Sequence, residues 1–238
     1  MLKIENYEVV GWEHAIRGMR NPMNSWEQSD SCWSYDMITK KPDLVTVDDD
    51  LLMDVQYDGD GSFVIGPNDQ KLMMNLRNAG TDHRKFMRML TVYVDITAPL
   101  YWWKEFDTYK VGTVANSCST MHKIHAKRFA IDDFSHEHLC ELSMKNLEDI
   151  VEVLNKCRDL YLGFDGFKHE VGDRTQKDYW WQMIQLLPSS YNQKRTVMLN
   201  YEVLANIYKS RKNHKLDEWH VLCEWIEKLP YSGLITGA

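Results

Sequence analysis

Several features common in other protein classes are missing from this sequence. No apolar run approaches the roughly 20 residues that a membrane-spanning helix needs, and the acidic, polar start does not resemble a signal peptide. The five cysteines include no CxxC pair, which is typical of reduced thiols in a cytoplasmic protein. The chain has no internal repeat and no low-complexity tract. We therefore expect a cytoplasmic protein without a membrane partner.

The sequence also has fewer basic than acidic residues. Lys and Arg number 28 against 35 Asp and Glu, so the net charge is -7. The surface as a whole should not attract nucleic acid polymers, and a nucleotide site would need a local basic pocket. The 238 residues fit a single domain, 1–238, that is long enough to bury a real core. Nine Trp and 12 Tyr suit aromatic pockets or a large oligomeric interface, or equally a core.

The most informative stretch runs from residue 91 to residue 125. Residues 91–97 alternate between apolar and polar side chains, which predicts a strand with one buried face. Pro99 suits the first turn of a helix, and the pattern predicts that helix over Leu100–Lys110. Gly112 ends it and a polar run follows. Such a unit could present side chains to a ligand.

The remaining elements alternate between helical stripes and short strands. We predict an α/β fold of the α+β type, with a central, mostly antiparallel sheet flanked by helices. Asn68 is the expected N-cap of one helix, which Gly80 terminates. The other expected elements are a strand within 1–12, a helical start to 13–35 that breaks at Asn21-Pro22, and helices over 68–79, 137–160, 174–187 and 200–210.

Cys118, His122 and His125 are spaced i, i+4 and i+7, so a continuous helix would place them on one face. They could bind zinc with a fourth ligand from residues 136–140. The alternative is a helix face that lines an interface. We favour that alternative because nothing fixes the fourth ligand, and we predict no metal.

The stretch 91–125 resembles the signature segment of the flavin-dependent thymidylate synthases. In that family a strand leads through Ala-Pro into a helix with a Gln and an aromatic residue. The motif Arg-His-Arg, two residues, Ser, one residue, Asn-Glu, one residue, Ser, one residue, Arg follows. The family pattern aligns with this chain without a gap, and Ala98-Pro99 match it. Glu105 stands for the Gln, and Thr108-Tyr109-Lys110 stand for Arg-His-Arg. Further along, Thr113 stands for the first Ser, Ala115-Asn116 for Asn-Glu, Cys118 for the second Ser and Thr120 for the last Arg.

A second stretch, from Leu186 to Trp219, resembles the family's Leu-Pro segment and the helix after it. Pro188, Asn200 and Leu204 match, and Arg211 matches the arginine that contacts the nucleotide. Glu202 stands where the family has an arginine that helps to hold flavin and nucleotide, which reverses a charge. The resemblance covers about residues 66 to 230.

Two N-terminal residues have two interpretations each. His83 lies 25 residues before Thr108 and falls on the family's His, which is linked to methyl-donor handling; otherwise it is a surface residue. Arg20 could correspond to an early arginine near the family's active site. The alternative, a surface arginine, is favoured for Arg20.

The resemblance implies a protein that binds dUMP or a related pyrimidine deoxynucleotide and transfers a one-carbon unit to it. FAD, methylenetetrahydrofolate and NADPH are the implied cofactors, and a homotetramer with sites shared between subunits is the implied assembly. The implied site residues are Cys118 and His83 for catalysis, Glu105, Lys110, Asn116 and Arg211 for the nucleotide, and His83, Asn200 and Lys110 for the cofactor.

The replaced arginines argue against the family's usual reaction. Thr108, Thr120 and Glu202 remove three positive charges and add one negative charge. Each lost charge-assisted hydrogen bond costs about 1.5–3 kcal/mol. Ordinary dTMP synthesis should therefore be weak or absent. Other basic residues remain as possible anion contacts, namely Lys110, Lys194, Arg195, Arg211 and Lys212.

Two functional hypotheses follow. In the first, the protein is a one-carbon transferase with an altered site, and the Cys118 thiolate adds to the pyrimidine ring. In the second, the protein is a catalytically inactive homologue that binds nucleotides or serves in assembly. For Cys118 itself, the favoured alternative to a nucleophile is a buried thiol that packs where Ser packed.

Overall fold

The computed structural model describes residues 2–34, 56–58, 61–164 and 174–237. These residues form two compact units, and each draws on separate segments of the chain. The first unit holds residues 1–4, 95–108 and 116–196, and the second holds residues 5–94, 109–115 and 197–238. The prediction of a single domain over 1–238 stays a prediction.

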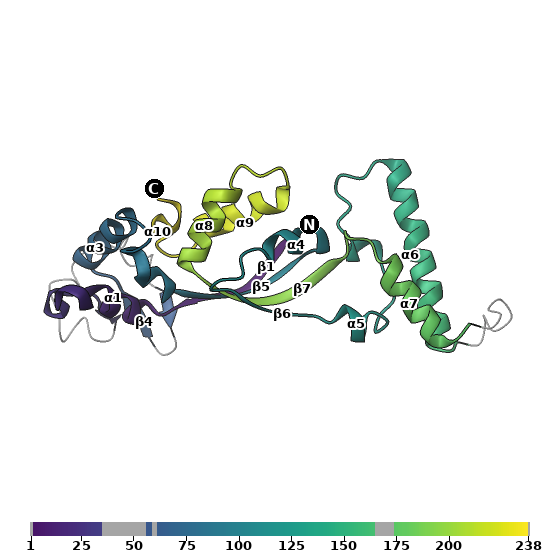
Figure 1. The fold of residues 1–238 in the computed structure, drawn as a ribbon, viewed down its shortest axis with the longest axis horizontal. Helices are drawn as coiled ribbons and strands as arrows, with labels where there is room; N and C mark the ends of the chain where they lie inside the picture. Colours follow the sequence, from purple (N-terminus) through teal and green to yellow (C-terminus); the bar gives the residue numbers. More distant parts are fainter. Residues whose placement is uncertain (1, 35–55, 59–60, 165–173, 238) are drawn as a thin grey trace. The chain divides into compact units, whose positions relative to one another are not determined.

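Two sheets organise the chain (Figure 1). The larger sheet is antiparallel and has the strand order β1 (Lys3–Val10), β5 (Thr91–Pro99), β7 (Asn192–Asn200), β6 (Val114–Ser117). The smaller sheet has the order β2 (Cys32–Trp33), β4 (Gly61–Val64), β3 (Gln56–Asp58), with antiparallel pairs. The alternation in β5 is as predicted, because Val92, Val94 and Ile96 are all buried.

The second unit packs its helices around aromatic side chains. Trp12 meets Tyr201 edge to face at 5.5 Å and Tyr231 at 5.2 Å between ring centroids. The Tyr201 hydroxyl donates to the carbonyl of Pro230 at 2.6 Å, and burial raises the pKa of Tyr201 well above its ordinary value. The helices are α1 (Trp12–Arg20), α3 (Pro67–Asn78), α8 (Tyr201–Arg211), α9 (Asp217–Glu227) and α10 (Gly233–Thr236), with 3-10 turns η1 (Asn21–Met23), η2 (Trp26–Gln28) and η5 (Arg84–Arg88).

The first unit contains a pair of packed helices, α6 (Glu141–Tyr161) and α7 (Gln176–Leu186), which lie side by side (Figure 1). Leu147, Leu154 and Met183 are buried between and beside them. The other helical elements of this unit are α4 (Leu100–Phe106), α5 (Thr120–Lys123) and η6 (Ile131–Asp133).

The predicted fold class is confirmed, with some corrections to individual elements. Asn68 is not a helix cap, because α3 begins one residue earlier, at Pro67, with Gly66 as its N-cap. The helix that starts at Leu100 ends at Phe106 and does not reach Lys110. Gly80 follows the end of α3 as predicted and has a φ of +109°, a conformation that glycine adopts readily.

Candidate functional site

Glu202 lies in the first turn of α8 and is held by two arginines of η5. Its carboxylate accepts from Arg84 Nε at 3.4 Å and forms an ion pair with Arg88, while its side chain is only 12% exposed. Burial alone would raise the pKa of Glu202, but the hydrogen bonds and charges of Arg88 and Arg84 outweigh it and lower the pKa below its ordinary value. The charge reversal at position 202 is thus balanced locally. Sequence reasoning missed both arginines as its partners.

Asn200 closes the N-terminus of α8. Its side-chain oxygen accepts from the backbone N–H of Val203 at 3.1 Å, as expected of an N-cap. Gly112, with a φ of +79°, lies against it, since a Cβ on Gly112 would be 2.9 Å from Asn200 Nδ2. The loop that contains Gly112 therefore lies at the start of α8, and the predicted cofactor residue Asn200 has a structural contact on each side of its amide.

Arg211, at the end of α8, lies among aromatic rings. Its Nε donates to the Tyr109 hydroxyl at 2.9 Å. Its guanidinium lies 4.7 Å from the Trp219 ring centroid and 5.6 Å from that of Tyr109. Tyr109, a position of the family motif, and Arg211, a predicted nucleotide residue, therefore come together. Lys110, next in the chain to Tyr109, is exposed.

His83 is exposed and immediately precedes η5. Its backbone N–H donates to the carbonyl of Gly80 at 3.1 Å. The turn from Gly80 leads directly into the two arginines that hold Glu202. The predicted role of His83 stays a prediction.

In the first unit, Cys118 is fixed to β7 through its backbone. Its N–H donates to the carbonyl of Lys194 at 2.9 Å, and its carbonyl accepts from Gln193 Nε2 at 2.9 Å. The Cys118 side chain is exposed, so the alternative of a buried packing thiol is wrong. The neighbouring candidate Asn116, in β6, is exposed as well.

Two basic residues of β7 already have carboxylate partners. Arg195 stacks over the Trp103 ring at 4.1 Å and donates to Asp107 at 2.7 Å. Lys194 pairs with Asp95 at 3.1 Å. Neither is therefore an unmatched positive charge for a ligand.

At the end of α4, Glu105 is half-buried, and the Thr108 hydroxyl donates to its carbonyl at 2.7 Å. Thr108 thus caps a helix end where the family has an arginine.

The helix that would have placed Cys118, His122 and His125 on one face does not form. The α5 helix ends at Lys123, and the His125 ring lies 4.8 Å from the Tyr161 ring. Within the part of the chain that the structure describes, no group of three or more His, Cys, Asp or Glu side chains is arranged to hold a metal ion.

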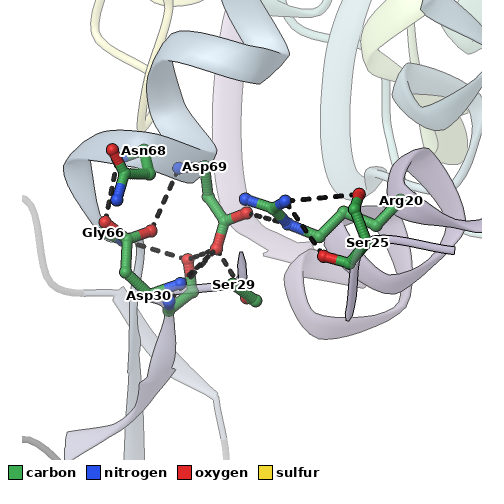
Figure 2. Close-up of polar contacts among 8 residues, drawn as sticks. Arg20, Ser25, Ser29, Asp30, Gly66, Asn68 and Asp69 are labelled. Carbon is green, nitrogen blue, oxygen red and sulfur yellow. Dashed lines mark hydrogen bonds and ion pairs between the residues drawn. The ribbon is translucent and has the colours of Figure 1, made fainter. Parts of the chain in front are cut away.

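Arg20 is buried rather than on the surface, which corrects the favoured alternative. It is 4% exposed and donates to Asp69, itself fully buried, at 2.6 Å (Figure 2). Burial raises the pKa of Asp69, but hydrogen bonds from Ser29, Ser31 and Arg20 outweigh it and lower the pKa. A cavity of about 320 Å³ borders this cluster, lined by Glu13, Ile16, Arg17, Arg20, Trp26, Ser29, Ser31, Cys32, Trp33 and Phe63.

Asp30 supplies the cap that was expected of Asn68. Its carboxylate accepts from the backbone N–H groups of Asn68 and Asp69 at 2.8 and 3.0 Å (Figure 2). The first turn of α3 is therefore capped by a residue 38 positions away. This cluster fixes the local fold around Asp69.

By sequence, the chain matches no family model and no curated protein. By structure, it matches thymidylate synthase X (ThyX) from Helicobacter pylori, solved with FAD and dUMP. One such structure has a TM-score of 0.59 and 14% identity and covers 100% of this chain and 98% of its own. Another has a TM-score of 0.60 and 15% identity and covers 99% and 98%. The chain has the ThyX fold. The resemblance seen in the sequence is thereby confirmed at the level of the fold.

The ThyX fold gives a frame for the site residues without assigning their roles. In the second unit, Glu202 and Arg211 lie on α8, Asn200 is the N-cap of that helix, and Gly112 and Tyr109 contact Asn200 and Arg211. No helix among the described residues is long and apolar enough to cross a membrane.

Proposed function

We propose that this protein binds a pyrimidine deoxynucleotide, dUMP or a close relative, on a ThyX fold, and that it does not carry out ordinary flavin-dependent dTMP synthesis. The observation that carries the proposal is the ion-pair cluster of Glu202 with Arg84 and Arg88. At position 202, where the family uses an arginine to hold flavin and nucleotide, this chain has a carboxylate that pairs with Arg84 and Arg88.

Nucleotide binding is supported by the arrangement around Arg211. The stacking of its guanidinium on Trp219 and its bond to Tyr109 hold it in one orientation. An oriented guanidinium suits phosphate oxygens, because its planar fork can donate to two of them. Lys110 adds a positive charge next to Tyr109. The ThyX structures of the same fold contain dUMP, which agrees with a nucleotide of that class.

The residues around position 202 do not fit a flavin pyrophosphate held as the family holds it. A pyrophosphate would face the carboxylate of Glu202, and Arg84 and Arg88 would have to leave that carboxylate to meet it. The side chain of Asn200, a predicted cofactor residue, caps the N-terminus of α8 and accepts from the Val203 N–H. FAD content should therefore be low.

A second candidate function rests on the exposure of Cys118. An exposed thiol, once deprotonated, could add to a pyrimidine ring: sulfur bonds to one carbon of the ring double bond, and the electrons of that bond move onto the ring carbonyl as an enolate. The enolate carbon then bonds the one-carbon unit, and loss of its proton with departure of the thiolate restores the ring double bond. Methylenetetrahydrofolate would supply the one-carbon unit and NADPH the reducing equivalents, as the family resemblance implies. A homotetramer with shared sites remains part of both candidates.

Isothermal titration calorimetry with dUMP tests the proposal. Arg211→Gln should weaken dUMP binding by about tenfold or more, because it removes a charge-assisted contact. Arg17→Gln is the matched control, since Arg17 is an exposed arginine of α1 that lies 3.1 Å from His14 Nδ1. Equal dUMP affinity in all three proteins would refute the role of Arg211, and no dUMP binding by the unmodified protein would refute the proposed function.

A further inference from the structure

A second cavity lies in the second unit, on a different face of α8 from the Arg211 cluster. Its volume is about 520 Å³, large enough for a nucleotide-sized ligand. Its walls come from the end of α3, the turn before η5, the outer face of α8, and α10. The lining residues are Arg77, Thr81, Arg84, Ala205, Asn206, Tyr208, Lys209, Lys212, Ile235 and Thr236.

Among the residues that the structure describes, the polar side chains of this lining are four bases and several neutral groups, with no carboxylate. Arg77 is positioned by bonds to the carbonyls of Leu234 and Ile235 at 3.2 and 3.3 Å. Arg84 donates to Asn206 at 3.2 Å. Lys209 and Lys212 are exposed. Two guanidinium groups are thus fixed by neighbours and two ammonium groups can move toward a ligand.

The negative partial charges at helix C-termini offset only part of this positive charge. The C-terminal ends of α3, α8 and α10 lie at the cavity, and each carries roughly half a negative charge. If Glu202 neutralises Arg84, three full positive charges remain in the lining, on Arg77, Lys209 and Lys212. A surplus of about one to two positive charges therefore remains, in a protein whose net charge is -7.

The rest of the lining suits a ligand that is not purely ionic. Tyr208 donates its hydroxyl to Glu227 at 2.6 Å, which raises the pKa of Tyr208 to about 12 and keeps the phenol neutral. Ile235 and Ala205 are both buried, so one wall is apolar. Thr81 and Asn206 add neutral hydrogen-bonding groups.

From these observations we infer that the cavity lined by Arg77, Arg84, Lys209 and Lys212 binds a small molecule with two or more phosphate groups, of the nucleoside di- or triphosphate class. Such a ligand has the charge to match several bases that no carboxylate of the lining neutralises. This site is separate from the proposed nucleotide site, because α8 presents Lys209 and Lys212 to the cavity and Arg211 to Tyr109 and Trp219. The inference does not depend on the proposed function.

Calorimetry with tripolyphosphate, ATP and dTTP tests this inference, at low ionic strength and at about 0.15 M salt. We expect one site per chain, with affinity that falls as salt rises. The doubly substituted Lys209→Gln, Lys212→Gln protein should bind at least about tenfold more weakly, and Lys71→Gln should bind as the unmodified protein does. Lys71 is the control because it is exposed on α3 and does not line the cavity.

The comparison among probes shows whether the cavity recognises the whole nucleotide or its phosphate groups alone. Tighter binding of ATP or dTTP than of tripolyphosphate supports a nucleotide, while equal binding supports recognition of phosphates alone. Either result supports the inference if the lysine substitutions weaken binding of the probes. The inference is overturned if no probe binds at low salt, or if the lysine substitutions leave the affinity unchanged. It is also overturned if dUMP displaces every probe and Arg211→Gln abolishes their binding, since one site would then explain both.

Discussion

Positive charges in the second unit occur in two kinds of surroundings. Arg20 faces Asp69 in a buried cluster, and Arg84 and Arg88 face Glu202 in a half-exposed one. Lys209 and Lys212, by contrast, border a cavity with no carboxylate among its described lining residues. Matched charges hold segments of the fold together, and charges without a carboxylate are available to an anionic ligand. Each of the following experiments tests that division.

The largest effect should come from Asp69→Asn. The substitution removes the negative partner of buried Arg20 and weakens the bonds from Ser29 and Ser31, so the free energy of unfolding should fall by about 3–5 kcal/mol. Urea denaturation followed by circular dichroism measures this. Asp149→Asn, at an exposed position in α6, is the control and should change the free energy of unfolding by less than about 0.5 kcal/mol. A small effect of Asp69→Asn would show that the cluster does not stabilise the fold.

Glu202→Gln should have an intermediate effect that depends on pH. Because the folded-state pKa of Glu202 is lowered, its contribution is present above the ordinary value of 4.5 and is lost as the pH falls through the lower folded-state pKa. At neutral pH the loss should be about 1 kcal/mol, since Arg88 is half exposed and its pairing is screened. Unfolding curves of both proteins at pH 7 and near pH 3 should converge at the acid end. A difference that persists unchanged in acid would mean that the ion pairs are not its source.

Removing the cavity lysines should have the smallest effect on stability. Without a ligand, Lys209→Gln and Lys212→Gln should each change the free energy of unfolding by less than about 0.5 kcal/mol, because no carboxylate of the lining depends on them. Thermal unfolding at low salt is the measurement. A loss comparable to that of Glu202→Gln would place these lysines among the matched charges and weaken the case for a ligand.

Local patterns in the sequence predicted most of the fold. The alternation in residues 91–97 and the helical stripes of α3, α6, α7 and α8 depend on neighbours within a few positions, and all are present. The core interpretation of the aromatic residues holds for Trp12, Trp102, Trp103 and Trp219, which are buried. The tetramer stays a prediction.

What the sequence did not reveal depends on distant partners. Arg20 is buried because Asp69, 49 residues away, can pair with it, and α3 is capped from Asp30. The arginines that balance Glu202 are 114 and 118 residues away from it. No local pattern marks such pairs. For the same reason the family motif could be aligned residue by residue, while the new partners of its replaced residues could not be foreseen.

Conversion of dUMP to dTMP tests the central claim most directly. The purified protein should be supplied with dUMP, FAD, methylenetetrahydrofolate and NADPH, and dTMP should be measured by chromatography, with dUMP binding confirmed by calorimetry in the same preparation. We expect dUMP to bind and dTMP to be absent or very low, because Glu202 takes up the charge of Arg84 and Arg88 and threonines replace two further arginines. Normal turnover to dTMP with bound FAD would contradict the account, and would show that other residues of this chain replace the family's arginines.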